Sequence, residues 1–187
     1  MKKVAILSSH NGSGFNTLYN ASQNKTLDIE IVLLISNNTK SVALKNAKER
    51  GIDAHLINAS TSPTPDDEIY KLLKNSGCDY IFLSGYMKKI SPQIASEFKV
   101  VNSHPALLPN YGGKGMYGRN VHEAVIANGE KVSGVTIHEV NEVYDDGKII
   151  LQKKLNISEN ESVDSLENRI KELESLAIFE SFQKYLK

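Results

Sequence analysis

Two hydrophobic patterns alternate along the first hundred residues of the chain. Runs rich in β-branched and aliphatic residues are typical of buried strands, and they occur at residues 3–9, 28–36, 53–59, 79–85 and 99–105. Between these runs, the spacing of apolar and polar residues predicts helices at residues 15–22, 40–51, 66–77 and 91–98. Strands that alternate with helices predict a mostly parallel sheet in a doubly wound, Rossmann-like α/β fold.

Residues that favour helix ends support these boundaries. Gly51 and Gly77 each follow a predicted helix, where glycine readily adopts the left-handed conformation that ends one. Ser91 and Pro92 stand where a cap and a first helical residue are expected.

The pattern changes in the second part of the chain. Residues 131–140 and 147–157 predict two longer strands joined by a turn, which we expect to form an antiparallel C-terminal pair. A final helix is predicted at residues 163–185, and its apolar stripe consists of Val163, Leu166, Ile170, Leu173 and Ala177. No repeat or linker interrupts the sequence, so we expect one domain spanning residues 1–187.

Composition narrows the class of protein. The chain has 22 Lys plus Arg and 22 Asp plus Glu, so it lacks the basic excess expected of a protein that binds nucleic acid or anionic membranes. Cys78 is the only cysteine, which excludes an intramolecular disulfide. The first residues do not resemble a signal peptide, and no apolar run has the length of a membrane span. We therefore expect a cytoplasmic protein that binds small molecules.

The loop at residues 8–16 is the first candidate binding site. Gly12 and Gly14 permit a tight turn, and the N–H groups at the start of the following helix suit an anion such as phosphate. An ordinary strand-to-helix turn is the alternative. The glycine pattern is a poor dinucleotide fingerprint, and Ser36 to Asn38 stand where an acidic residue for the ribose is expected, which disfavours NAD.

The end of the fifth predicted strand carries the second candidate site. Asn102 and His104 are two residues apart in an extended segment, so their side chains point to the same side. Asp145, followed by Asp146 and Gly147, lies between the last two strands, where its carboxylate can approach His104. A solvated strand end and a simple hairpin turn are the alternatives for these two segments.

The histidines do not form a metal-binding pattern. His10, His55, His104, His122 and His138 include no helical ligand pair, and a single cysteine cannot build a thiolate site. We therefore expect no metal.

Several of these segments together resemble a known family. The sequences HNGSGFN (residues 10–16), LSGYMKKISP (83–92), NSHPALLP (102–109) and SGVTIHEVNEVYDDGKIILQ (133–152) are similar to those of formyltransferases that use 10-formyltetrahydrofolate. The resemblance extends almost from end to end. It is specific for formyl transfer but less so for the amine that accepts the formyl group.

The resemblance implies that Asn102, His104 and Asp145 are catalytic. A primary amine would attack the formyl carbonyl, and a tetrahedral intermediate bearing an oxyanion would form. Asn102 and a protonated His104 would donate hydrogen bonds to that oxyanion. Asp145 would orient His104, favour its cationic form and help to move the amine proton. With this resemblance, the catalytic interpretation of Asp145 is favoured over a simple turn.

Substrate-binding residues are implied in the same way. The ribotide phosphate would bind the loop containing Asn11, Gly12, Ser13, Gly14 and Asn16. The folate would contact Tyr86, Met87, Lys88, Lys89 and Ile90 on one side and Asn141, Glu142, Val143 and Tyr144 on the other. His138 matches a histidine near the family's site, and an ordinary structural role for it is an equal alternative.

One expected phosphate-binding residue is missing. Family members commonly have an arginine just before the third helix, whereas residues 62–71 contain none. Lys171 and Glu174 on the last helix match a Lys and a Glu that contact the ribotide, and we expect them to bind its phosphate and ribose hydroxyls. The alternative is an exposed ion pair between the two residues.

The resemblance leaves the acceptor amine as the main open choice. Relatives that act on methionyl-tRNA or sugars usually carry a further C-terminal domain, so the length of this chain favours glycinamide ribonucleotide as the acceptor. Another amine, such as an amino-sugar nucleotide, is the second hypothesis. A catalytically silent relative that binds folate or nucleotide is the third.

Overall fold

Seven strands form one sheet with the order β3-β2-β1-β4-β5-β6-β7. The computed structural model describes residues 1–185, which divide into two units at the boundary between Val101 and Asn102. Strand β5 (Lys99–His104) crosses that boundary, so it begins in the first unit and ends in the second. The predicted α/β fold with a mostly parallel sheet is confirmed.

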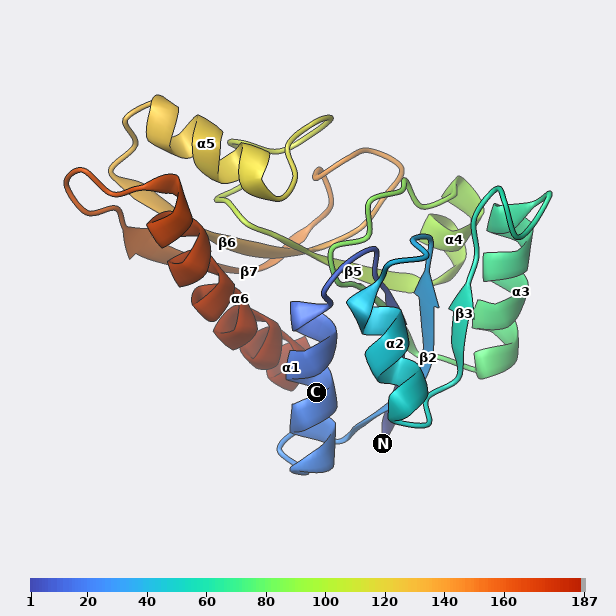
Figure 1. Cartoon of the computed structure of the whole chain (residues 1–187). Coiled ribbons are helices and arrows are strands. Elements are labelled where there is room, and N and C mark those ends of the chain that lie inside the picture. Colours follow the sequence, from blue (N-terminus) through green and yellow to red (C-terminus); the bar gives the residue numbers. More distant parts are fainter. Residues whose placement is uncertain (186–187) are drawn as a thin grey trace. The chain divides into compact units, whose positions relative to one another are not determined.

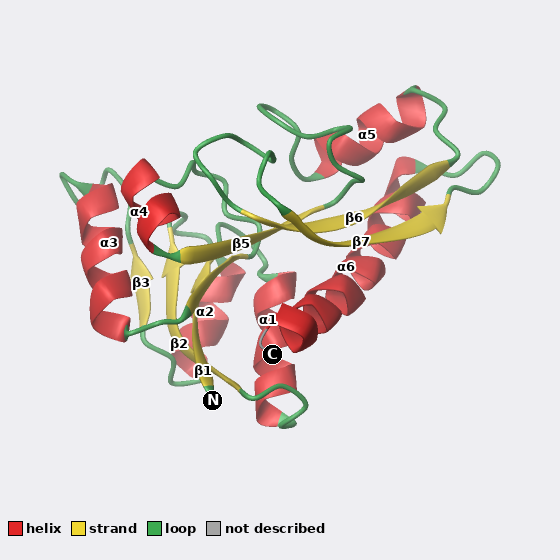
Figure 2. Cartoon of the chain, turned by 180° about the vertical axis from the view of Figure 1, so that it is seen from behind, coloured by secondary structure: helices red, strands yellow, loops and turns green. Residues whose placement is uncertain are grey.

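The first unit alternates strands and helices as predicted. It contains β1 (Lys2–Leu7), α1 (Ser13–Gln23), β2 (Ile29–Ser36), α2 (Val42–Glu49), β3 (Ala54–Leu56), α3 (Pro65–Ser76), β4 (Tyr80–Leu83) and α4 (Pro92–Glu97). Strand β1 pairs in parallel with β2 and β4, and β2 pairs in parallel with β3. Because crossovers between parallel strands are right-handed, α1 and α2 cover one face of these strands and α3 and α4 cover the other (Figures 1 and 2).

Local signals account for several helix ends in this unit. Ser91 accepts a hydrogen bond from the backbone N–H of Ile94, and Pro92 is the first residue of α4, as predicted. Gly77 ends α3 with a φ of 61°, a conformation that favours glycine over other residues.

The second unit consists of α5 (Arg119–Ala127), β6 (Val132–Glu139), β7 (Ile149–Asn156) and α6 (Val163–Tyr185), after the end of β5. Strands β6 and β7 are antiparallel, as predicted. Helix α6 packs against both of them (Figure 1). Leu166, Ile170 and Ala177 of the predicted stripe are buried, whereas Val163 and Leu173 are only partly covered.

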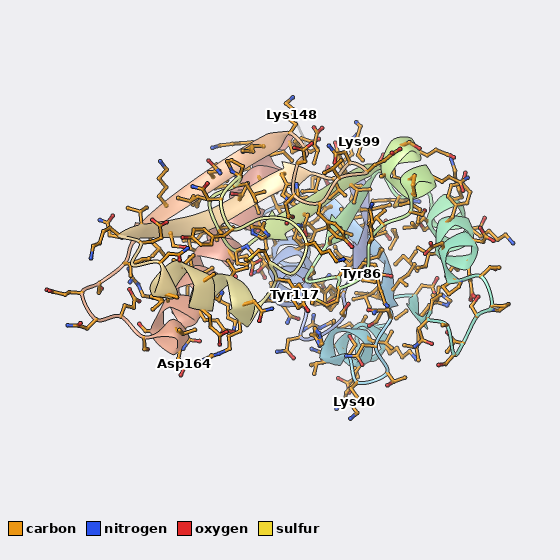
Figure 3. All side chains as sticks on the ribbon, turned by 90° about the horizontal axis from the view of Figure 1, so that it is seen from above. Lys40, Tyr86, Lys99, Tyr117, Lys148 and Asp164 are labelled. Atoms are coloured by element: carbon orange, nitrogen blue, oxygen red, sulfur yellow. The ribbon has the colours of Figure 1, made fainter. Side chains whose placement is uncertain are left out.

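Helix α5 was not predicted from the sequence. Its apolar face is narrow, and the buried residues Val121, His122 and Val125 include a histidine, which weakens the amphipathic pattern. The helix packs against α6. Arg119 at its start forms an ion pair with Asp164 in the first turn of α6, and Asp164 is labelled in Figure 3.

Two kinds of feature are absent from residues 1–185. No helix in this range is long and apolar enough to cross a membrane. No group of three or more His, Cys, Asp or Glu side chains in the same range is arranged to hold a metal ion.

Candidate active site

The end of β5 presents Asn102 and His104 on the same side of the strand. His104 is 3% exposed, and its Nε2 lies 2.7 Å from the carbonyl oxygen of Tyr111. A carbonyl oxygen only accepts hydrogen bonds, so Nε2 carries a hydrogen and donates it. The other ring nitrogen, Nδ1, lies 3.6 Å from Oδ2 of Asp145. Nδ1 is therefore the ring nitrogen that is left available to exchange a proton.

Asp145 is held in the loop between β6 and β7. Its backbone has a φ of 55°, a left-handed conformation that Asp tolerates better than most residues. Its Oδ2 accepts a hydrogen bond of 2.8 Å from the backbone N–H of Gly113, and its Oδ1 lies 3.5 Å from Nε2 of His138. The carboxylate is thus fixed between two imidazole rings, His104 on one side and His138 on the other.

His138 lies at the centre of this cluster rather than in an unrelated structural position. Its Nδ1 donates to the carbonyl oxygen of Glu139 at 2.8 Å, which leaves the lone pair of Nε2 to accept from Nδ2 of Asn102 at 3.1 Å. One N–H of the Asn102 amide is therefore occupied, and the second N–H is available to a ligand.

The electrostatics of the cluster favour a neutral histidine beside an ionised carboxylate. Burial lowers the pKa of His104, and this effect outweighs the nearby Asp145 carboxylate and Tyr111 carbonyl, which act in the opposite direction. Burial tends to raise the pKa of Asp145, but the imidazoles of His138 and His104 and the N–H of Gly113 outweigh it, and this pKa is lowered. The resemblance implied a protonated His104 favoured by Asp145. The carboxylate does act in that direction, but burial outweighs it.

Gly147 fits against the end of β6. A Cβ atom at this position would overlap the carbonyl group of Glu139, the same carbonyl that accepts the hydrogen bond from His138. The glycine is therefore required by a close backbone approach two residues after Asp145.

Replacing Gly147 with alanine is expected to lower both stability and kcat. Overpacking of this kind costs about 1–3 kcal/mol of unfolding free energy, and the displaced carbonyl would also disturb His138. Thermal unfolding and steady-state kinetics measure the two effects. Gly129→Ala is the control for kcat. A Cβ there meets nothing within 4 Å, but alanine is strained at its φ of 65°, so Tm should fall while kcat stays normal. Normal Tm and kcat in Gly147→Ala would contradict this account.

Two loops of the first unit lie side by side at the carboxyl ends of β1 and β4. The backbone N–H of Ser9 donates to the carbonyl of Gly85, and the hydroxyl of Ser9 accepts from the N–H of Met87. Ser84 accepts a hydrogen bond from the N–H of Phe15 in the first turn of α1. The strand order reverses between β1 and β4, which is where open α/β sheets bind ligands.

The predicted phosphate loop has the expected local geometry at the start of α1. Gly12 caps the helix with a φ of 66°, and a Cβ there would lie 2.6 Å from Cβ of Ala43. Asn11 and Ser13 are exposed, whereas Gly14 is buried. The carboxamide oxygen of Asn16 accepts a hydrogen bond of 2.8 Å from Arg50, so this oxygen is engaged within the protein.

The predicted folate segment after β4 is only partly exposed. Met87, Lys88 and Lys89 are exposed, but Ile90 is buried and contributes to the core rather than to an open apolar wall. Tyr86, labelled in Figure 3, is half-buried. Burial, assisted by the negative charge of Asp66, raises the pKa of Tyr86 to about 12. In the second unit, the predicted folate loop preceding Asp145 is exposed, and its residues are Asn141, Glu142, Val143 and Tyr144.

Lys171 and Glu174 do not pair with each other. Nζ of Lys171 lies 2.7 Å from Oε1 of Glu167, one turn earlier on α6, and its side chain is exposed. Glu174 accepts a hydrogen bond of 2.6 Å from the hydroxyl of Ser103. Burial raises the pKa of Glu174, whereas Ser103 and the charge of Lys171 act in the opposite direction. The ion pair considered as an alternative for these two residues is therefore not formed.

Several groups around His104 were missed by sequence reasoning. The carbonyl of Tyr111 and the N–H of Gly113 are backbone groups, so residue identity does not indicate their contacts. Thr136 donates to the carbonyl of Ala106, and Gln152 donates to that of Leu108, so two strand residues fix the loop after β5. The only available signal for Thr136 and Gln152 was that both are polar residues in apolar strands.

Comparisons with known proteins show which family the chain resembles. Residues 2–182 match the family described as formyl transferase. A relative from Haemophilus influenzae, phosphoribosylglycinamide formyltransferase, is 35% identical over 179 residues, which cover 93% of this chain and 82% of that protein. The chloroplastic phosphoribosylglycinamide formyltransferase of Arabidopsis thaliana is also 35% identical over 90% of this chain. This chain spans about three fifths of the length of that plant relative, since the match covers 60% of it.

Solved structures give the same result. Phosphoribosylglycinamide formyltransferase from Bacillus halodurans superposes with a TM-score of 0.91 at 29% identity, covering 100% of this chain and 96% of that one. Glycinamide ribonucleotide transformylase 1 from Geobacillus kaustophilus superposes with the same TM-score at 28% identity, covering both chains completely. On the match over residues 2–182, this chain belongs to the formyl transferase family.

Proposed function

We propose that this chain transfers the formyl group of 10-formyltetrahydrofolate to the primary amine of glycinamide ribonucleotide, a step of purine biosynthesis. The observation that carries the proposal is the cluster of Asn102, His104, His138 and Asp145, in which each imidazole has one nitrogen fixed by a backbone carbonyl. The names of the relatives support the choice of substrates. No metal is needed for this chemistry.

His104 would act first as a base and then as an acid. Its lowered pKa favours the neutral ring, so Nδ1 can take a proton as the amine attacks the formyl carbon. The ionised Asp145 beside Nδ1 would stabilise the imidazolium that results. The same nitrogen would then return the proton to the departing folate nitrogen. The free N–H of Asn102 would donate to the oxyanion of the intermediate.

Each unit contains residues that we propose for substrate binding. In the first unit, the N–H groups of Ser13 and Gly14 in the first turn of α1 suit the ribotide phosphate, because these groups lack acceptors within the helix. Asn11 and Gly12 complete that loop. The exposed parts of residues 86–89 and 141–144 would contact the folate. In the second unit, Lys171 would contact the phosphate and Glu174 the ribose hydroxyls.

Lys171→Ala is expected to raise KM for the ribotide with little change in Tm. The ion pair with Glu167 joins residues four apart on the surface of α6, and such pairs contribute only about 0.3–0.5 kcal/mol to stability. A charge-assisted hydrogen bond to phosphate contributes more, so KM should rise by about tenfold or more.

Lys184→Ala provides the matched control for Lys171→Ala. Lys184 lies on the same helix and also pairs with a glutamate four residues earlier, Glu180, and it should leave KM unchanged. An unchanged KM in Lys171→Ala would contradict its proposed role. The next candidate for the phosphate cation would then be Lys114, an exposed residue in the glycine-rich segment at residues 112–115.

Product analysis tests the activity itself. The purified protein, incubated with 10-formyltetrahydrofolate and glycinamide ribonucleotide, should release tetrahydrofolate and N-formylglycinamide ribonucleotide in equal amounts. Folate binding by calorimetry without product would instead identify a catalytically silent relative. The expected cytoplasmic location stays a prediction, because three plant relatives are named as chloroplastic.

A further inference from the structure

Ser103 occupies the strand position between the two proposed catalytic residues. Side chains alternate along β5, so Asn102 and His104 face one side of the strand and Ser103 faces the other. The side chain of Ser103 is buried, and its Oγ lies 2.6 Å from Oε1 of Glu174 on α6. A carboxylate oxygen accepts, so the serine hydroxyl is the donor. This bond ties the strand that carries the catalytic pair to the helix that carries Glu174.

Glu174 depends strongly on this one contact. Glu174 is half-buried, and a carboxylate that loses part of its hydration relies on hydrogen-bond donors to stay ionised. Within residues 1–185, the Ser103 hydroxyl is the only donor found within hydrogen-bonding distance of the Glu174 carboxylate. Because only Oε1 accepts from Ser103, Oε2 stays available as an acceptor for ligand hydroxyls.

Most charged or titratable groups on α6 and on the elements packed against it have other partners. Lys171 on the same helix pairs with Glu167, and Arg119 of α5 also pairs with Glu167. On β6, His138 contacts Asn102 and Asp145, and Glu139 accepts from the hydroxyl of Tyr185. On β7, Lys153 pairs with Glu180, and His122 of α5 is buried, with its Nδ1 unpaired within residues 1–185. None of these bonds holds the carboxylate of Glu174.

We propose that Ser103 is a positioning residue that holds the Glu174 carboxylate in the orientation that accepts hydrogen bonds from the ribose hydroxyls of the acceptor substrate. This proposal rests on the proposed function. Ser103, which would orient the ribose-binding carboxylate, lies directly between Asn102 and His104 on β5. The proposal assigns Ser103 to acceptor binding rather than to the chemical step.

The kinetic test separates these two possibilities. Ser103→Ala should raise KM for glycinamide ribonucleotide roughly tenfold, as expected for loss of a hydrogen bond to a charged group. Its kcat and its KM for 10-formyltetrahydrofolate should stay within about twofold of the wild-type values, since the variant removes no group from the reacting atoms. Ser103→Thr retains the hydroxyl and should restore KM. A normal KM in Ser103→Ala, or a loss confined to kcat, would overturn the proposal.

A neighbouring serine supplies the matched control. Ser133 on β6 is also buried, but its Oγ has no hydrogen-bond partner within residues 1–185. Ser133→Ala should therefore leave both KM values unchanged. If it raised KM for the ribotide as much as Ser103→Ala does, the effect would reflect general packing and the proposal would fail. Ser103→Cys, close in volume but a weak donor, replaces Ser103→Ala if the alanine variant does not fold.

A titration followed by NMR tests the same contact without any assay of activity. With ¹³C-labelled glutamate carboxyl groups, the Glu174 signal is identified by its absence in Glu174→Gln. Loss of the Ser103 donor disfavours the carboxylate, so the pKa of Glu174 should be higher in Ser103→Ala than in the wild type. An unchanged titration would overturn the proposal. Failure of the wild-type protein to formylate glycinamide ribonucleotide would instead refute the proposed function. Because the titration needs no activity, it tests the Ser103 proposal separately from the proposed function.

Discussion

Replacing Asp145 with asparagine is expected to lower kcat by about 10²–10³-fold while changing ribotide affinity far less. The carboxylate lies 3.6 Å from Nδ1 of His104 and 3.5 Å from Nε2 of His138. In the proposed mechanism it stabilises positive charge on His104 as the amine proton arrives. Asparagine has the same shape and can still accept from Gly113, but it lacks the charge. Loss of one group that stabilises developing charge typically costs about 2.7–4 kcal/mol of barrier.

For Asp145→Asn, steady-state kinetics measures kcat and calorimetry measures the affinity for the ribotide. Asp146→Asn is the control, since that carboxylate is adjacent in sequence but exposed, and it should change kcat by less than about twofold. A kcat within about threefold of the wild-type value in Asp145→Asn would remove Asp145 from the mechanism.

His104→Ala is expected to reduce kcat by a similar or larger factor. The ring is buried, its Nε2 is fixed by the Tyr111 carbonyl, and its Nδ1 is the only nitrogen free to exchange a proton. General acid–base catalysis by one side chain contributes about 10²–10⁴-fold. Because the alanine leaves a cavity, Tm is measured in parallel, and His104→Asn keeps a polar side chain in the space. His55→Ala, which removes an exposed histidine paired with Asp53, should have normal kcat. Near-normal turnover in both His104 variants would contradict the mechanism.

The pH dependence of kcat/KM distinguishes a neutral from a cationic His104 in the free protein. The folded pKa is lowered, so the neutral ring persists at pH 6.5 and protonates only as the pH falls through the lower folded value. The acid limb should therefore lie below pH 6.5. The free energy of unfolding should change with pH in the same direction as activity. The contribution of neutral His104 to stability is present above pH 6.5 and is lost as the pH falls through the folded pKa. A rise of activity on acidification through pH 6.5 would indicate a required imidazolium.

Local sequence signals predicted most of the fold. Helix α6 begins and ends at the predicted residues, Ser91 caps α4, and Gly77 ends α3. Each of these features depends on neighbouring residues, so the pattern alone contains the information. Helix α5 was missed because the preceding segment is rich in glycine and a histidine occupies its buried face.

The candidate site was predictable only in part. Asn102 and His104 share a strand, so their common side follows from alternation, and the resemblance indicated Asp145. Contacts between residues far apart in the sequence could not be predicted from local patterns. Asn16 accepts a hydrogen bond from Arg50, and Glu174 accepts one from Ser103, 71 residues away. The protonation preference of His104 also depends on burial, which is a property of the folded chain.

Acceptor specificity tests the central claim most directly. The measurement is kcat/KM for formyl transfer from 10-formyltetrahydrofolate to glycinamide ribonucleotide, compared in the same preparation with an amino-sugar nucleotide. A site that hydrogen-bonds its own substrate discriminates by about 10⁴-fold or more against a poorly matched one, so the ribotide should be preferred by at least that factor. Equal or faster transfer to the amino-sugar nucleotide, or no transfer to either acceptor, would contradict the account.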